Sequence, residues 1–336
     1  MFKKAIMTAA AAAAMAVGIL SATAVNAADK EVNFGIISTE STSSLKAQWQ
    51  PFLGAMEKGT GLKINAFFAP DYAGVIEAMR FDKVQVAWFG NKSAMEAVKR
   101  SNGEIFAQSV DANGNPGYWS LLIAHKDSKI NTLDDLLKCD GTLDFGIGDP
   151  NSTSGFLVPT TYVFAKNNVT PAKCFKTVRS ANHQANALAA ANKLVDVATN
   201  NTENMRRLEE SNPTEFAKLK IIWKSPLIPS DPLVWRKDLD QDIKNRLYTF
   251  IMTYGRTGSV EEVKTARDIL AALQWAPFRP SSDAQLFPIR ILAINKDILK
   301  IKNDTKWSDA EKATKVAELE AQAAEITMLT ESVPNM

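Results

Sequence analysis

The chain has 336 residues, of which 46% are hydrophobic and 23% are charged, enough for two domains with cores of their own. It carries 39 Lys and Arg residues against 37 Asp and Glu residues, and two of the basic residues lie within the first four positions. Without those two the charges balance, so bulk charge gives no reason to expect binding to nucleic acid or to an anionic membrane.

The N-terminus has the pattern of a secretory signal peptide. Lys3 and Lys4 form a basic start, residues 5–20 are apolar, and residues 25–27 are mostly small, before an expected cut ahead of Ala28. A retained membrane anchor is the alternative, but the apolar run is short and rich in Ala. No Cys stands at the expected cut after this run, and no later stretch reaches the roughly 20 apolar residues of a membrane span. We therefore expect a soluble, exported protein without a lipid anchor.

The rest of the chain alternates short apolar strands with helical stretches. A first series of strands is predicted at 32–37, 63–68, 84–89 and 105–108, with helices at 45–58, 72–80 and 92–100. A second series of strands is predicted at 143–147, 175–179, 195–199 and 219–223, again with helices between them. This alternation predicts an α/β fold with mostly parallel sheets, whose ligands bind beyond the carboxyl ends of the strands.

The most informative segment, GDPNSTSGF at 148–156, joins a predicted strand to a predicted helix. Its three hydroxyl residues, Ser152, Thr153 and Ser154, stand where the helix begins. The first turn of a helix has unpaired N–H groups and a partial positive charge, so three added O–H donors make a socket for phosphate, phosphonate or sulfate. An ordinary N-cap is the alternative, although a cap needs only one hydroxyl.

The two cysteines, Cys139 and Cys174, each precede a predicted strand. If those strands are parallel neighbours, both cysteines lie at the same edge of the sheet, within reach of a disulfide. An oxidising compartment permits this bond, and two free thiols are the alternative.

Two extended runs, 119–124 and 232–236, are predicted to cross between two lobes. The predicted division is a signal peptide at 1–27, an outer lobe at 28–118 and 237–300, an inner lobe with the crossing strands at 119–236, and a C-terminal helical tail at 301–336. A chain that leaves for a second lobe and returns has two strands at a hinge, which suits closure on a ligand.

The tail begins with a capping box from Ser308 to Glu311. Apolar residues then recur at three- and four-residue steps at Val316, Leu319, Ala323, Ile326 and Val333. The resulting amphipathic helix either packs on its own lobe or pairs with a second copy in a homodimer.

Catalytic patterns are sparse in this sequence. It has two histidines, His125 and His183, and no Gly-x-Ser-x-Gly, His-Glu-x-x-His or Walker sequence. Glu203 follows a predicted strand and Asp231 lies at the returning crossing, so each is a candidate for ligand contact or an ordinary turn or helix-start residue. We expect a binding protein without a cofactor or metal, not an enzyme.

Five segments resemble the periplasmic phosphonate-binding proteins of bacterial ABC importers, and the resemblance covers nearly the whole mature chain. The segments are Asn33–Glu40, Phe67–Gly74, Asp149–Pro159, Val195–Asn204 and Trp223–Pro229. The resemblance implies the type II periplasmic binding protein fold, in which crossing strands join two α/β lobes around a ligand cleft. It also implies a location in the periplasm and a membrane permease as partner.

The same resemblance implies a ligand site with two ends. At one end, residues 152–154 hold the phosphonate oxygens, and the phenol groups of Tyr72 and Tyr118 complete the anion shell. At the other end, Glu203 and Asp231 pair with an ammonium group of the ligand.

His183 lies close to that ammonium end in the family pattern. Phe89 stands in for a tyrosine found in relatives, and the cysteines are not part of the pattern.

The implied site predicts an organophosphonate ligand, above all 2-aminoethylphosphonate. Inorganic phosphate would leave both carboxylates unpaired in a closed cleft, which is costly. The second hypothesis is a binding protein for another oxyanion, such as phosphite, phosphate or a sulfonate. The third is a secreted hydrolase that uses a serine of the motif, although a base with an orienting partner is missing from the sequence pattern.

Overall fold

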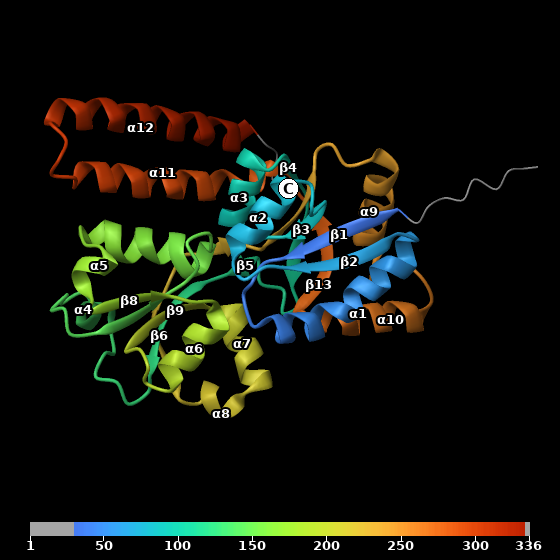
Figure 1. Ribbon diagram of the computed structural model, residues 1–336, viewed down its shortest axis with the longest axis horizontal. Helices are drawn as coiled ribbons and strands as arrows, with labels where there is room; N and C mark the ends of the chain where they lie inside the picture. Colours follow the sequence, from blue (N-terminus) through green and yellow to red (C-terminus); the bar gives the residue numbers. More distant parts are fainter. Residues whose placement is uncertain (1–29, 333–336) are drawn as a thin grey trace, which may run out of the picture.

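In the computed structural model, which describes residues 30–332, the chain folds into two α/β lobes and a C-terminal helical hairpin (Figure 1). The predicted two-lobed α/β fold is confirmed. The predicted signal peptide and Val333 lie outside the described residues. None of the helices within residues 30–332 combines the length and apolar composition needed to cross a bilayer.

The outer lobe is built on a six-stranded sheet with strand order β13-β4-β12-β3-β1-β2. Its strands are β1 (Glu31–Ile36), β2 (Lys63–Phe68), β3 (Val86–Trp88), β4 (Gly103–Asp111), β12 (Pro232–Arg236) and β13 (Trp275–Pro280). Its helices are α1 (Thr42–Thr60), α2 (Tyr72–Arg80), α3 (Asn91–Arg100), α9 (Gln241–Thr253) and α10 (Val260–Ala272), with the short 3-10 turn η4 (Asp283–Leu286) after β13.

Helix α1 shows how local sequence sets these elements. It begins at Ser41, whose side chain accepts a hydrogen bond from the Ser44 N–H, and it ends at Gly61, whose φ of 66° is a left-handed conformation that glycine adopts easily. Between its ends α1 buries Trp49, which packs within 5.3 Å, between ring centroids, of Trp88 and Trp275. This aromatic cluster ties α1 to the sheet.

The inner lobe is built on a five-stranded sheet with strand order β10-β6-β9-β7-β8. Its strands are β6 (Ser120–His125), β7 (Asp144–Ile147), β8 (Thr177–Ser180), β9 (Val197–Asn201) and β10 (Leu219–Lys224). Its helices are α4 (Leu133–Leu136), α5 (Pro171–Cys174), α6 (His183–Ala191), α7 (Thr202–Ser211) and α8 (Pro213–Phe216). The predicted helix that follows the hydroxyl motif is instead formed by wide π turns, η1 (Thr153–Leu157) and η2 (Thr160–Phe164), and then a 3-10 turn, η3 (Ala165–Asn167).

The sheets are mixed, which corrects the prediction that they are mostly parallel. In the outer lobe β1 is parallel to β2 and β3, but β12 is antiparallel to both β3 and β4. The reason is that β12 is the chain returning from the inner lobe, so it enters the outer sheet from the opposite direction. In the inner lobe β6 likewise arrives from the other lobe and is antiparallel to β9 and β10.

A two-stranded ribbon joins the lobes. It consists of β5 (Gly117–Tyr118) on the outgoing chain and β11 (Ile228–Pro229) on the returning chain, paired antiparallel. A Cβ atom at Gly117 would lie 2.0 Å from the Ile228 carbonyl oxygen, so this approach requires glycine. The ribbon lies just before the two runs, 119–124 and 232–236, that were predicted to cross; those runs themselves largely form β6 of the inner sheet and β12 of the outer sheet.

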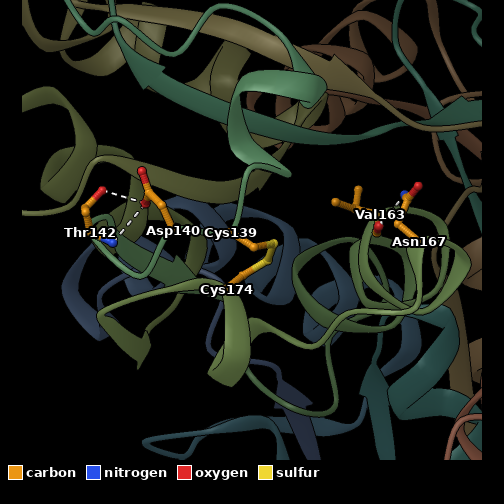
Figure 2. The surroundings of a disulfide bond; sticks show 6 residues. All are labelled: Cys139, Asp140, Thr142, Val163, Asn167 and Cys174. Atoms are coloured by element: carbon orange, nitrogen blue, oxygen red, sulfur yellow. Dashed lines mark hydrogen bonds between the residues drawn. A yellow bond between two sulfur atoms is a disulfide. The ribbon is translucent and has the colours of Figure 1, made fainter.

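Cys139 and Cys174 form a disulfide (Figure 2). Cys139 lies shortly before β7 and Cys174 ends α5, shortly before β8, and these two strands pair in parallel. The disulfide predicted from the position of the cysteines before neighbouring strands is therefore confirmed.

The C-terminal hairpin consists of α11 (Phe287–Lys302) and α12 (Asp309–Ser332). α11 packs Ile289 and Leu292 against inner-lobe and hinge residues, although the sequence placed 237–300 in the outer lobe. α12 lies along α11 in Figure 1, and Val316 is its buried residue. This packing on the chain itself is the first of the two alternatives for the tail, and pairing with a second copy stays a prediction.

Candidate ligand-binding site

The two lobes enclose a cavity of about 10 Å³, which has room for about one water molecule. The structure brings all eight predicted site residues to the wall of this cavity. They are Tyr72, Tyr118, Ser152, Thr153, Ser154, His183, Glu203 and Asp231. Each is less than a tenth exposed, so the lobes are closed around the site.

At one end, the hydroxyls of residues 152–154 are arranged as donors. Ser152 caps η1, and its Oγ accepts a bond from the Gly155 N–H at 2.9 Å. The Thr153 Oγ1 accepts from the Lys92 N–H at 2.8 Å, and the Ser154 Oγ accepts from the Asn201 side-chain amide at 3.1 Å. Because each oxygen already accepts an N–H, each hydroxyl retains its own proton to donate.

Thr153 also joins the two lobes. Its partner, the Lys92 N–H, is one of the amides at the start of α3 that have no partner within the helix. Close by, the Tyr72 N–H at the start of α2 donates to Asp149 Oδ2 at 3.2 Å, again from the outer lobe to the inner lobe. Two helix starts of the outer lobe therefore meet the hydroxyl segment of the inner lobe.

The two tyrosines of the wall differ in their contacts. The Tyr72 side chain lies beside Ser152 at the hydroxyl end, and burial raises the pKa of its phenol, which stays protonated. The Tyr118 hydroxyl donates to Asp231 Oδ1 at 3.0 Å, although the sequence expected it to face the anion. Tyr118 comes from β5, so it ties the hinge to the carboxylate end.

The wall also holds two buried carboxyl groups, those of Glu203, in the first turn of α7, and Asp231, in the loop between β11 and β12. Burial raises the pKa of Glu203, and the nearby charge of Arg207 partly opposes this shift. Burial also raises the pKa of Asp231, and the negative charge of Glu203 raises it further. Two carboxyl groups that resist ionisation side by side form a site suited to a cation.

His183, the first residue of α6, lies next to the hydroxyl segment. Its Nε2 is 3.4 Å from Ser152 Oγ and 3.5 Å from Ser154 Oγ, and its Nδ1 is buried without a hydrogen-bond partner among the described residues. Burial lowers the pKa of His183 to about 3, so the ring is neutral near pH 7.

Six further wall residues were not predicted as site residues: Ile37, Thr39, Trp88, Gly90, Asn201 and Arg207. Trp88 and its neighbour Phe89 both belong to the hydrophobic core of the outer lobe, but of the two only Trp88 also reaches the cavity wall, beside Asp231. Asn201 caps α7 and lies within Val195–Asn204, one of the five segments that resemble the family. Arg207 follows Glu203 by one helical turn, a spacing that would have placed it on the same face of α7.

Residues 34–286 match the family of periplasmic substrate-binding proteins of phosphonate ABC transporters. The chain belongs to this family. Its members are binding components of importers and not enzymes, and the type II periplasmic binding protein fold and the expected periplasmic location follow from the family.

Phosphonate-binding relatives align along most of the chain. The phosphonates-binding periplasmic protein of Escherichia coli is 56% identical over 92% of this chain and 89% of its own length. The solved structure of a binding protein component of an ABC phosphonate transporter from Pseudomonas aeruginosa is 54% identical, with a TM-score of 0.87 over 90% of this chain and 99% of that chain. A more distant relative, the phosphate-import protein PhnD of Mycolicibacterium smegmatis, is 29% identical over 69% of this chain and 74% of its own length.

The geometry around His183 agrees with a phosphonate-binding protein that has no hydrolytic activity. A serine nucleophile needs a base of suitable pKa whose second ring nitrogen is oriented by another group. The low pKa of His183 makes it a weak base, and its Nδ1 has no orienting partner among the described residues. His183 is therefore poorly suited to activate Ser152 or Ser154.

Proposed function

We propose that this phosphonate-binding protein takes 2-aminoethylphosphonate as its main ligand. The observation that supports the proposal is a single cavity wall that holds three O–H donors at 152–154 and two buried carboxyl groups, Glu203 and Asp231. A ligand with a phosphonate and an ammonium group would match both sets of groups at once.

The hydroxyl end supports an oxyanion. Neutral donors that are already held in place by Gly155, Lys92 and Asn201 need little reordering when a ligand arrives. Each hydrogen bond to a charged group contributes roughly 1.5–3 kcal/mol. Several such bonds on a preorganised segment can hold a phosphonate without a lysine or arginine in the hydroxyl motif itself.

The carboxylate end supports an amine. Arg207, the cation that favours the ionised form of Glu203, already forms its own ion pair with Glu40. A ligand ammonium group would supply the charge that makes ionisation of Glu203 and Asp231 favourable. A phosphonate without an amine leaves that end uncompensated, so it should bind more weakly.

Isothermal titration of the mature protein with 2-aminoethylphosphonate, ethylphosphonate and inorganic phosphate tests this proposal. We expect one-to-one binding of the aminophosphonate that is at least about 30-fold tighter than that of ethylphosphonate, equivalent to roughly 2 kcal/mol. Equal affinities for the two phosphonates would contradict the role of the carboxyl groups.

Binding of another oxyanion is the second candidate function, and the relative named as a phosphate-import protein favours it. A carboxyl group can accept a proton of hydrogen phosphate, so Asp231 gives phosphate one partner if the anion sits deep in the cavity. The same titration separates the two candidates, because this function requires phosphate to bind more tightly than the aminophosphonate.

Delivery of the ligand to a membrane permease and export by the segment 1–27 belong to the same proposal. Export should remove the segment, so N-terminal sequencing of protein from the periplasm is expected to begin at Ala28. A sequence that begins at Met1 would contradict export by cleavage.

A further inference from the structure

Two consecutive arginines of α7 reach from the inner lobe to the outer lobe. The Arg207 Nε donates to Glu40 Oε1 at 2.5 Å, in the segment between β1 and α1. Arg206 forms an ion pair with Asp111, the last residue of β4, with its Nη1 3.3 Å from Oδ1. One helix of the inner lobe therefore contacts two separate places on the outer lobe.

Both carboxylate partners are fixed and buried. Glu40 also accepts from the Gln48 side chain at 2.9 Å, and Asp111 accepts from the Asn113 N–H at 2.7 Å. The Glu40 and Asp111 side chains are 5% and 4% exposed, so these ion pairs are shielded from the solvent and salt that weaken surface pairs. Each acceptor is held in place before its arginine arrives.

These contacts depend on closure because the partners lie on opposite sides of the hinge ribbon. When the lobes part, α7 moves away from β4 and from the start of α1, and all four charged groups return to water. The ion pairs therefore stabilise the closed state alone, and they shift the equilibrium between open and closed lobes toward the closed one. If the closed state is less stable, the lobes open more readily and the ligand dissociates faster.

We propose that Arg206 and Arg207, with Asp111 and Glu40, form a latch that holds the lobes closed and sets the dissociation rate of the ligand. Glu40 is a positioning residue, because it does not line the cavity and its effect reaches the ligand through closure of the lobes; Arg207 lines the cavity wall and takes part in the latch through its ion pair with Glu40. The proposal rests on phosphonate binding at this cavity but not on recognition of the amine. It therefore predicts the same effect for phosphonates with and without an amine.

Stopped-flow tryptophan fluorescence tests the latch, since Trp88 lies in the cavity wall. Association and dissociation rates of 2-aminoethylphosphonate and methylphosphonate are measured for the wild type, Arg207→Gln, Glu40→Gln and the double variant. We expect the dissociation rate to rise at least about tenfold for both ligands, with the association rate nearly unchanged. The dissociation rate of the double variant should not exceed that of either single variant, because both substitutions remove the same ion pair.

Arg100→Gln is the matched control. It is the same substitution at an arginine whose partner, Glu77, lies in the same lobe, so it should leave the dissociation rate unchanged. Arg207→Lys keeps the charge and is expected to fall between the wild type and Arg207→Gln. It also serves as the test variant if Arg207→Gln does not fold.

Unchanged dissociation rates in the Arg207 and Glu40 variants would overturn the latch. A loss confined to 2-aminoethylphosphonate would overturn it too, because it would place Arg207 at the amine end of the site. If the wild type binds methylphosphonate but not 2-aminoethylphosphonate, the proposed ligand is wrong and the latch is judged from methylphosphonate alone.

Discussion

At the scale of single residues, Glu203 and Asp231 are two buried carboxyl groups whose ionisation is unfavourable in the ligand-free protein. Both are buried, burial raises the pKa of both, and the charge of Glu203 acts against ionisation of Asp231. The Tyr118 hydroxyl and the Arg207 charge compensate this in part. The pair is therefore costly to the ligand-free protein and favourable once a cation is bound.

Asp231→Asn is expected to stabilise the ligand-free protein. A carboxyl group whose pKa is raised by folding adds stability below its unfolded pKa of about 3.9, and this stability is lost as the pH rises through the folded pKa. A neutral Asn removes that loss, so the free energy of unfolding should rise by about 1–2 kcal/mol at pH 8 and by less at pH 4. Urea unfolding at the two pH values measures this, and a variant less stable than the wild type at pH 8 would contradict it.

Binding of 2-aminoethylphosphonate is expected to release protons from the carboxyl pair. The ligand ammonium favours ionised Glu203 and Asp231, whose pKa values are raised in the ligand-free protein, so affinity should increase from pH 5 to pH 8. His183, with a pKa of about 3, stays neutral in this range and adds nothing. Titration calorimetry in buffers of different ionisation enthalpy counts the protons.

Ethylphosphonate is the control for that count. Its phosphonate group titrates in the same pH range, by analogy with phosphate esters of pKa about 6, but it has no amine. Equal proton release by the two ligands would exclude the carboxyl pair as the source.

At the scale of elements, the π turns of η1 and η2 and the disulfide shape the inner lobe. The wide turns begin at Ser152, so the capping of η1 also sets the position of three hydroxyls at the cavity. The disulfide ties the approach to β7 to the approach to β8 and does not line the cavity. Its contribution should therefore be to stability and not to binding.

Replacement of both Cys139 and Cys174 by Ser is expected to lower the free energy of unfolding by about 3–4 kcal/mol, because the bond closes a loop with a sequence separation of 35 residues. Urea unfolding under oxidising conditions, compared with the wild type, measures this loss. The affinity for 2-aminoethylphosphonate should stay unchanged, and a large loss of affinity with intact stability would contradict a structural role.

Many of the helices and strands could be predicted from local patterns in the sequence. The strands around 32–37 and 63–68 and the helix around 45–58 follow from apolar periodicity and capping, both of which act over a few residues. The antiparallel insertion of β12 between β3 and β4 depends on where the returning chain meets the outer sheet, a long-range property without a local signal. The π turns likewise lie in a segment whose composition suits an ordinary helix.

The cavity wall shows the same division between local and long-range information. The hydroxyl motif could be found from sequence because three O–H donors at the start of a helix are suited to bind an oxyanion. The contribution of Trp88 could not, since a buried aromatic residue in β3 is equally suited to the core, where its neighbour Phe89 lies. The ion pair of Arg207 with Glu40 joins residues that are far apart in the chain, so it required the fold.

At the scale of the whole molecule, ligand binding and lobe closure are one process. The closed cavity of about 10 Å³ is smaller than any alkylphosphonate, so entry and accommodation of a ligand require the lobes to separate at the ribbon of β5 and β11. Contacts between the lobes, such as Thr153 with Lys92 and Tyr72 with Asp149, then form again around the ligand. Closure brings Asp231, which precedes β12 of the outer sheet, against Glu203 and the hydroxyl segment of the inner lobe.

The most direct test of the two-ended site compares 2-aminoethylphosphonate with ethylphosphonate in the wild type, Glu203→Ala and Asp231→Ala by isothermal titration. Glu209→Ala, an exposed position on the same helix, is the control. We expect each of the first two changes to weaken binding of the aminophosphonate by about 2–5 kcal/mol and to leave ethylphosphonate almost unaffected, so that the preference for the amine disappears. A preference that survives both substitutions would show that Glu203 and Asp231 do not bind the amine.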